Sequence, residues 1–266
     1  MSKDFPTAWT KAAFSFEPNP SFVDLLRTVT PEATHPQSPG GMVTFPEGTT
    51  ILAMVTSDGV VVAGDRRATE GHTIADRKME KVFPADRFSA VAIAGAAGPA
   101  IEMVRLFQTE LEHYEKLEGE NLSLEGKANR LAQMIRANFP MAMQGLVVVP
   151  VFSGYDDRRG EGRIYRYDAV GGRYEETQFH ATGSGGVHAR GTLRREWKPG
   201  IANDDAIKLA VRALADAAQE DAATGGPDLV RGIFPIVATV TSDGYLRVPD
   251  ATLATITAEL ADEGAL

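Results

Sequence analysis

The sequence predicts an α+β fold in which helices cover antiparallel β-sheets. Short β-like segments and longer helical segments come in groups along the 266 residues: strands, two helices, strands, two helices, strands and a final helix. Neighbouring β-like segments are joined by tight turns, such as Ser57-Asp58-Gly59 and Ser242-Asp243-Gly244. Because hairpins rather than βαβ crossovers join the strands, a layered antiparallel sandwich is favoured over a doubly wound parallel sheet.

Each element follows from its hydrophobic pattern and its flanking breakers. Short apolar runs predict strands at residues 50–56, 59–64, 80–84, 88–94, 146–154, 163–168, 173–180, 233–241 and 244–248. Helical spacing predicts helices at about residues 99–115, 124–138, 186–197 and 204–220, and a last one after Pro249-Asp250. Val170-Gly171-Gly172 is a strong hairpin signal, and Pro150 indicates a bulge or an edge position in its strand.

Residues 1–48 differ in character from the rest of the chain. They contain seven prolines and end in Pro46-Glu47-Gly48, a density of breakers that prevents a regular core. Within them, only residues 22–27 (FVDLLR) have the spacing of a short amphipathic helix. We therefore divide the chain into an arm, residues 1–48, and a packed domain, residues 49–266. Composition alone is compatible with a simply disordered arm.

Composition excludes several classes of function. The chain carries 27 basic and 36 acidic residues, a formal charge of −9, which argues against nucleic-acid binding and against attraction to anionic membranes. It has no cysteine, so disulfides, thiolate metal sites and a cysteine nucleophile are excluded. No apolar run approaches the roughly 20 residues of a membrane helix, and the N-terminus lacks a secretory signal. A cytoplasmic protein is expected.

The common catalytic motifs are missing. The five histidines lack metal-binding spacing and are scattered over His35, His72, His113, His180 and His188. Gly183-Ser184-Gly185-Gly186 has neither the spacing of a phosphate-binding loop nor that of a serine-hydrolase elbow. We expect no metal and no organic cofactor.

The junction Gly48-Thr49 offers a different kind of chemistry. A breaker-rich arm ends in glycine, and the next residue is a threonine that opens a hydrophobic strand. If the arm were removed, Thr49 would carry a free α-amine beside its own hydroxyl. With a reference pKa of about 7.7–8.0, that amine can act as a general base near neutral pH. Thr49 would then combine nucleophile and base, although a threonine at a strand start is also ordinary β-propensity.

Asp65 and Lys81 supply a physical reason for Thr49 to be reactive. Asp65 ends the second expected strand and Lys81 begins the third, so both can lie beside the start of the first strand in an antiparallel sheet. A cation near the Thr49 hydroxyl would favour its deprotonated form, and Asp65 would hold Lys81 charged and in place. The alternative is a surface ion pair of little energetic value.

These residues belong to a longer pattern that resembles a known family. The strings GTTILAM, VVVAGDRRAT, AIAGAAG, HYEKLEG, ATGSGG and ATGGPDLVRG resemble the β-subunits of actinobacterial proteasomes. The likeness runs from Gly48 to about residue 248, and the arm matches only in kind, as a propeptide of variable sequence. It implies the four-layer αββα fold of N-terminal-nucleophile hydrolases, with two antiparallel sheets, and a threonine endopeptidase made by autocatalytic cleavage between Gly48 and Thr49.

The resemblance also implies roles for individual residues. Thr49 is the expected nucleophile, Asp65 and Lys81 its activating pair, and the Gly95 amide the oxyanion hole. The groups expected to orient the α-amine are Ser184, Asp221 and Thr224. The peptide backbone would bind as an added strand at Thr69, Gly95 and Ala97. An apolar pocket for the residue before the cut would be lined by Ala68, Met79, Ile93 and Ala97, although Met79 and Ile93 are also ordinary core residues.

The resemblance implies partners as well. Seven β-subunits would form a ring, two such rings would stack, and rings of α-subunits would cap both ends. A ring ATPase or another activator would supply unfolded or tagged polypeptides. Three alternatives remain open: a non-catalytic structural β-subunit, the simpler two-ring bacterial protease with the same nucleophile, and a cytosolic binding module with a disordered arm.

Overall fold

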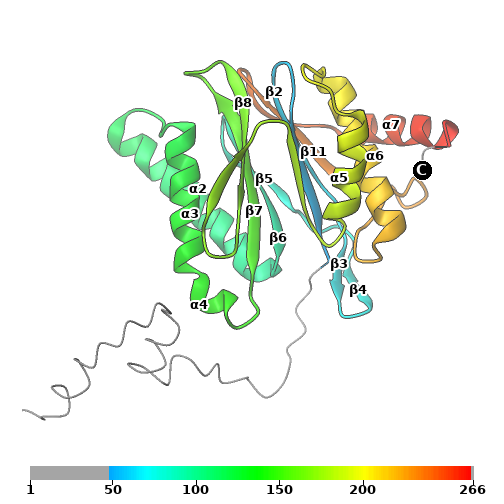
Figure 1. The fold of residues 1–266 in the computed structure, drawn as a ribbon, viewed down its shortest axis with the longest axis horizontal. Helices are drawn as coiled ribbons and strands as arrows, with labels where there is room; N and C mark the ends of the chain where they lie inside the picture. Colours follow the sequence, from blue (N-terminus) through cyan, green and yellow to red (C-terminus); the bar gives the residue numbers. More distant parts are fainter. Residues whose placement is uncertain (1–47, 265–266) are drawn as a thin grey trace, which may run out of the picture. The chain divides into compact units, whose positions relative to one another are not determined.

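Two five-stranded antiparallel sheets face each other at the centre of the protein (Figure 1). The structure is a computed structural model that describes residues 48–264, so the short helix expected at residues 22–27 lies outside the described residues. The β1 sheet consists of β10 (Phe179–Gly183), β1 (Thr50–Val55), β2 (Gly59–Gly64), β11 (Ile236–Thr241) and β12 (Gly244–Arg247), in that order. The β7 sheet consists of β5 (Val82–Asp86), β6 (Ser89–Gly95), β7 (Val148–Asp156), β8 (Glu161–Tyr167) and β9 (Arg173–Glu176).

Helices cover the outer face of each sheet. The β7 sheet packs against α2 (Ala97–Glu118) and α3 (Leu124–Ala137), and the β1 sheet packs against α5 (Gly186–Glu196) and α6 (Asn203–Glu220) (Figure 1). The last helix, α7 (Asp250–Asp262), packs on α6. The described residues therefore form the expected four-layer αββα sandwich. No helix among them is both long and apolar enough to span a bilayer.

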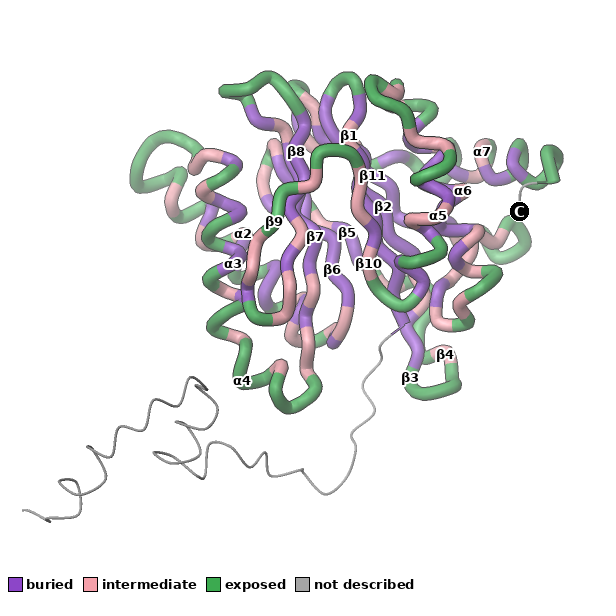
Figure 2. Tube along the Cα trace, viewed as in Figure 1, coloured by how far each residue is buried: buried purple, intermediate pink, exposed green. Residues whose placement is uncertain are grey.

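Strand β1 explains why the sequence produces this layering. Its side chains alternate between two cores: Ile51 and Ala53 pack between the sheets, whereas Leu52 and Met54 pack under the helices. Because successive side chains of a strand point to opposite faces, a strand with the continuous apolar run Ile51–Val55 must be covered on both sides. Figure 2 shows the same pattern, with buried residues along the strands and exposed residues on the outer faces of the helices.

Pro150 occupies the kind of position that the sequence indicates. It pairs with Ile93 on the β6 side, but the ladder between β7 and β8 begins only at Val151 and Arg166. Since β7 has no β8 partner at Pro150, the missing N–H of proline leaves no gap in that ladder. The prediction of a local edge position is confirmed.

The prediction of a single strand at residues 173–180 is wrong. The structure has two strands there, β9 and β10, and they belong to different sheets. The chain crosses between the sheets at Thr177-Gln178, where the Gln178 carbonyl accepts a hydrogen bond of 2.8 Å from the Val55 amide. Both halves have a β-like pattern, so composition cannot reveal the crossing.

A short hairpin and a short helix were not predicted from the sequence. Strands β3 (Ala68–Glu70) and β4 (Thr73–Asp76) form a hairpin whose turn contains Gly71 at φ +56°. The hairpin is largely exposed and has no clear apolar alternation. The single-turn helix α4 (Phe139–Ala142) follows α3 directly. Neither carries the periodicity on which a prediction rests.

His180 in β10 should make stability depend on pH. Burial lowers its pKa to about 4, against about 6.5 in an unfolded chain. Between these values the unfolded state binds more protons, so this residue lowers the free energy of unfolding as the pH falls from 6.5 to 4. His180→Gln should therefore lose less stability than the parent between pH 6.5 and 4.5, measured by urea unfolding of the full-length chain. His72→Gln, at an exposed turn, is the control, and an equal loss in all three proteins would contradict the prediction.

Candidate active site

Gly48 and Thr49 lie immediately before β1, at the end of the sandwich where several strands begin or end. The Thr49 carbonyl accepts a hydrogen bond of 2.8 Å from the Ser184 amide, which continues the pairing of β1 with β10. The Thr49 hydroxyl donates to the Gly48 carbonyl oxygen at 2.7 Å. The hydroxyl is therefore already in contact with the peptide unit that joins the arm to the domain.

Lys81 and Asp65 form a buried ion pair beside this junction. Their side chains are 1% and 0% exposed, and Lys81 Nζ lies 2.7 Å from Asp65 Oδ1. Lys81 Nζ also donates to the Arg67 carbonyl at 2.5 Å and to the Gly48 carbonyl at 3.0 Å. An ammonium group has three N–H donors, so these three acceptors use all of them. Lys81 and Thr49 thus converge on one oxygen, that of Gly48.

Burial determines the electrostatics of Lys81. Loss of water lowers the pKa of its ammonium, and the neighbouring Asp65 carboxylate opposes this effect only in part. A lowered pKa makes the Lys81 ammonium a stronger acid than that of an exposed lysine. It is suited to assist proton transfer as well as to stabilise negative charge.

Asp65 is fixed by backbone amides from three parts of the chain. Its Oδ1 accepts from the Thr50 amide at 2.8 Å, and its Oδ2 accepts from the amides of Arg67 at 2.9 Å and Gly225 at 2.8 Å. With Lys81, the carboxylate has four hydrogen-bond donors. Such a network leaves the carboxylate little freedom to rotate, and thereby fixes the lysine.

A second polar network lies on the other side of Thr49. The Ser184 hydroxyl donates to Asp221 Oδ2 at 2.5 Å, and Thr224 Oγ1 lies 2.6 Å from the same oxygen. The Thr49 backbone nitrogen lies 3.4 Å from Ser184 Oγ. Burial pushes the pKa of Asp221 upward, but the hydrogen bonds from Ser184 and Thr224 outweigh it and lower the pKa overall. These groups surround the nitrogen that would become the α-amine of Thr49.

The two networks meet at Thr50. Its hydroxyl lies 2.6 Å from Thr224 Oγ1 and accepts from the Gly185 amide at 3.1 Å. A Cβ on Gly185 would come within 2.5 Å of Thr50 Oγ1, so only glycine fits there. The structure thus brings six of the expected site residues together: Thr49, Asp65, Lys81, Ser184, Asp221 and Thr224.

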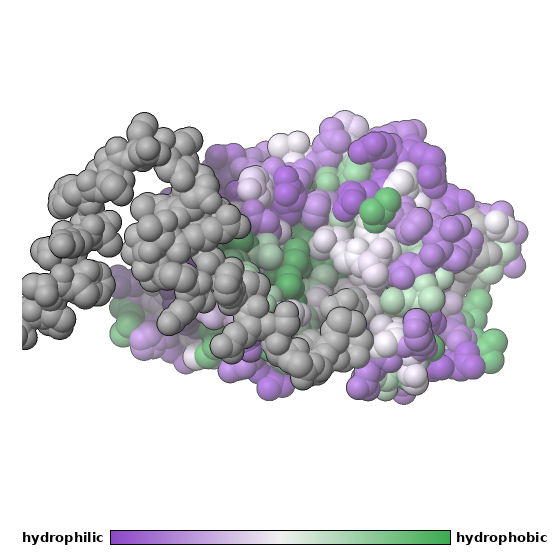
Figure 3. All heavy atoms as spheres, turned by 60° about the horizontal axis from the view of Figure 1, so that its bottom comes forward, coloured by the Kyte–Doolittle hydropathy of each residue, from purple (hydrophilic) through white to green (hydrophobic). Residues whose placement is uncertain are grey.

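The expected substrate-binding residues lie around the same end of the sandwich. Gly95, at φ +100°, ends β6 and lines a cavity of about 200 Å³ with Gly183, where an added Cβ would collide with the Thr49 carbonyl oxygen. Thr69 Oγ1 lies beside Gly48. In Figure 3, hydrophobic residues gather in the middle of this face, between polar margins.

The four residues expected to line an apolar pocket are spread over several elements. Ala68 is in β3, Met79 precedes β5, Ile93 is in β6 and Ala97 begins α2. Ile93 packs in the core beneath α2, as expected if it is an ordinary core residue. A pocket shared by Ala68, Met79, Ile93 and Ala97 remains a prediction.

Sequence reasoning missed three contributors to the site: Arg67, Gly185 and Gly225. The Arg67 carbonyl and the Gly225 amide act through the backbone, which residue type does not reveal. A partial signal existed for Arg67, because an aspartate commonly accepts a hydrogen bond from the amide two residues later. Gly185 belongs to the glycine-rich segment 183–186 and could have been suspected of close backbone packing.

Comparison with known proteins agrees with the fold. The αββα sandwich with a threonine at the start of β1 is that of the N-terminal-nucleophile hydrolases. Residues 46–230 match the proteasome subunit family. A protein named Proteasome subunit beta, from Acidimicrobium ferrooxidans, is 59% identical over 245 residues, which cover 92% of this chain and 90% of that protein. The chain belongs to the proteasome subunit family, as a β-subunit of the bacterial 20S type. Such subunits are components of a protease and assemble in rings with other proteasome subunits.

Proposed function

We propose that this chain is the precursor of a threonine endopeptidase and that Thr49 is its nucleophile. One observation carries the proposal: the Thr49 hydroxyl and the Lys81 ammonium both donate to the Gly48 carbonyl, at 2.7 and 3.0 Å. A nucleophile in contact with this peptide unit and a cation that polarises its carbonyl are the two groups that self-cleavage requires.

Maturation removes residues 1–48. The Thr49 hydroxyl attacks the Gly48 carbonyl carbon and gives up its proton, the Gly48–Thr49 amide bond breaks, and the amide nitrogen takes a proton to become an amine. The product is an ester between Gly48 and Thr49 Oγ. Water then hydrolyses the ester, leaving Gly48 with a carboxylate and Thr49 with a free hydroxyl and a free α-amine. Departure of the Gly48 carbonyl also releases one N–H of Lys81.

In the mature subunit, the same groups act on a substrate peptide. The Thr49 hydroxyl transfers its proton to its own α-amine and attacks the substrate carbonyl, and the released Lys81 N–H stabilises the developing alkoxide. The amine then protonates the leaving nitrogen, and an ester forms on Thr49. Water, activated by the amine, hydrolyses the ester. Ser184 and Asp221 hold the amine in place, and the Gly95 amide binds the oxyanion.

Substrate and partners follow from the family. The chain would bind unfolded polypeptides as an added strand at Thr69, Gly95 and Ala97, with a preference for an apolar residue before the cut. It would act in the cytoplasm in stacked rings of seven, capped by α-subunits and served by a ring ATPase or another activator. Separation from the cytoplasm inside such a particle would restrict cleavage to chains that are threaded in.

Mass spectrometry of the assembled particle tests this function. Assembly with its α-subunit should shorten the chain by the 48 residues before Thr49, and the particle should hydrolyse peptides. A peptide-hydrolysing particle in which the N-terminal arm remains attached would overturn the mechanism. A particle that neither cleaves itself nor hydrolyses peptides would indicate the structural role instead.

Gly48→Ala should slow maturation without altering the mature enzyme. An added Cβ would lie 2.5 Å from Thr69 Oγ1 and 2.7 Å from the Ala223 carbonyl, so Gly48 would be displaced from Thr49. Overpacking of this size costs about 1–3 kcal/mol, which predicts self-cleavage about 5- to 150-fold slower. Time-resolved electrophoresis after mixing with the α-subunit measures the rate.

Because the mature chain begins at Thr49, processed Gly48→Ala particles should be as active as the parent. Gly191→Ala is the matched control, since a Cβ there meets only the end of Arg195, at 3.7 Å. Cleavage of Gly48→Ala at the parental rate would contradict the steric argument.

A further inference from the structure

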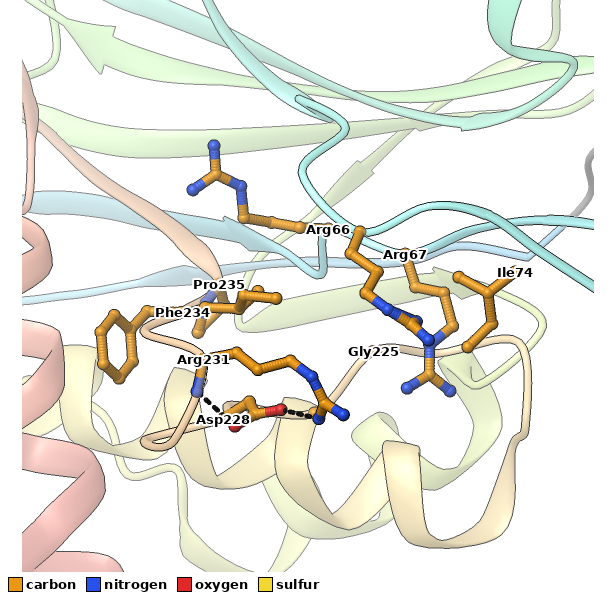
Figure 4. Close-up of a pocket in the computed structure, with 11 residues that line it drawn as sticks. Arg66, Arg67, Ile74, Gly225, Asp228, Arg231, Phe234 and Pro235 are labelled. Carbon is orange, nitrogen blue, oxygen red and sulfur yellow. Dashed lines mark hydrogen bonds and ion pairs between the residues drawn. The ribbon is translucent and has the colours of Figure 1, made fainter.

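A separate cavity of about 110 Å³ lies close to Asp65, and four of its eleven lining residues are arginines. Arg66 and Arg67 come from the segment after β2, and Arg231 and Asp228 come from the loop between α6 and β11, which faces that segment (Figure 4). Arg77, which follows β4, also lines the cavity. Two regions distant in sequence, residues 66–77 and 225–235, therefore bring arginines to one small concave site.

The positive charge of this cavity is not balanced by its own lining. The lining contains four arginines and one carboxylate, Asp228, and that carboxylate is already paired with Arg231 at 2.7 Å. The buried Nε of Arg66 makes no hydrogen bond to any described residue. Such a concentration of arginine is unexpected in a chain whose formal charge is −9. Guanidinium groups that crowd together repel one another unless an anion lies between them.

We propose that this cavity binds a single oxyanion group, either a carboxylate or a phosphate. The planar fork of arginine matches both groups, and clusters of arginine are a recurring means of binding them. Gly225 and Gly226 also line the cavity and contribute no side chains to it. The volume suits one such group rather than a larger organic ligand.

The cavity shares two residues with the surroundings of Asp65. The amides of Arg67 and Gly225, both of which line the cavity, donate to Asp65 Oδ2 at 2.9 and 2.8 Å. An anion bound by the Arg67 side chain would therefore steady the two amides that orient the carboxylate partner of Lys81. Only this consequence rests on the proposed function, whereas the binding itself is independent of it.

Inorganic phosphate is the probe for the test. Binding to the unassembled full-length chain is measured by isothermal titration calorimetry at constant ionic strength, with chloride as the balancing salt. We expect saturable binding of one phosphate per chain. Arg77→Gln should weaken it at least about tenfold, because one charge-assisted hydrogen bond is lost. Arg158→Gln, an exposed arginine in the turn after β7, is the matched control and should bind as the parent does.

Asp228→Asn gives a result that misfolding cannot imitate. It removes the one negative charge of the lining and frees Arg231, so phosphate should bind more tightly than to the parent. Absence of saturable binding to the parent, or parental affinity in Arg77→Gln, would overturn the proposal. Both experiments measure phosphate binding and not peptide hydrolysis. A negative result would therefore contradict the anion site without contradicting the proposed catalysis.

The assembled particle distinguishes two sources of the oxyanion. If a free anion is the natural ligand, the assembled particle should still bind phosphate. If an acidic side chain of a neighbouring subunit fills the cavity, assembly should abolish phosphate binding, and Arg77→Gln should then slow assembly.

Discussion

Thr49→Ala is expected to give a particle that neither removes its arm nor hydrolyses peptides. The substitution deletes the only hydroxyl in contact with the Gly48 carbonyl among the described residues. Loss of the nucleophile of a hydrolase typically lowers kcat by several orders of magnitude, so activity should fall at least about 10³-fold. Fluorogenic peptide hydrolysis and mass spectrometry of the purified particle measure the two effects.

The Thr49 side chain makes one hydrogen bond among the described residues. Its hydroxyl bonds only to Gly48, whereas its backbone carries the contacts to Ser184. Thr49→Ala should therefore fold and assemble as the parent does. Thr49→Ser retains both hydroxyl and amine and should mature and hydrolyse peptides. If Thr49→Ala hydrolysed peptides at the rate of Thr49→Ser, another residue would have to be the nucleophile.

The sequence was most informative about the contacts of the site that are made by side chains. Thr49, Asp65 and Lys81 lie next to strand boundaries that hydrophobic patterns locate well, so their approach in an antiparallel sheet could be expected. The family resemblance was needed for Ser184 and Asp221, which are 37 residues apart and follow different elements. No local pattern relates two loops that meet only through the packing of α5 and α6 on one sheet.

The sequence was least informative about the contacts that are made by backbone groups. Lys81 donates to the carbonyl of Arg67, and Asp65 accepts from the amide of Gly225, 160 residues away. Every residue has these groups, so no residue type marks them. The crossing from β9 to β10 is similar, because two adjacent segments with the same β-like pattern enter different sheets. Such features depend on the tertiary arrangement and not on local propensity.

Lys81→Met is expected to abolish self-cleavage and peptide hydrolysis, and also to destabilise the subunit. It removes the cation at the Gly48 carbonyl and leaves Asp65 charged, fully buried and without its ionic partner. Loss of one partner of a buried pair costs about 3–5 kcal/mol. A loss of activity in Lys81→Met alone would therefore not separate chemistry from folding.

The double variant Asp65→Asn/Lys81→Met separates the effect on catalysis from the effect on stability. It removes both charges and keeps similar volumes, and asparagine can still accept hydrogen bonds from the amides of Thr50, Arg67 or Gly225. We expect urea unfolding to show stability recovered toward the parent, while self-cleavage and peptide hydrolysis stay at background. Recovery of both stability and activity would show that the pair serves only the fold. Recovery of stability alone assigns the Asp65–Lys81 pair to the chemistry of Thr49, because the stable inactive subunit then differs from the active parent only in the two charged groups of that pair.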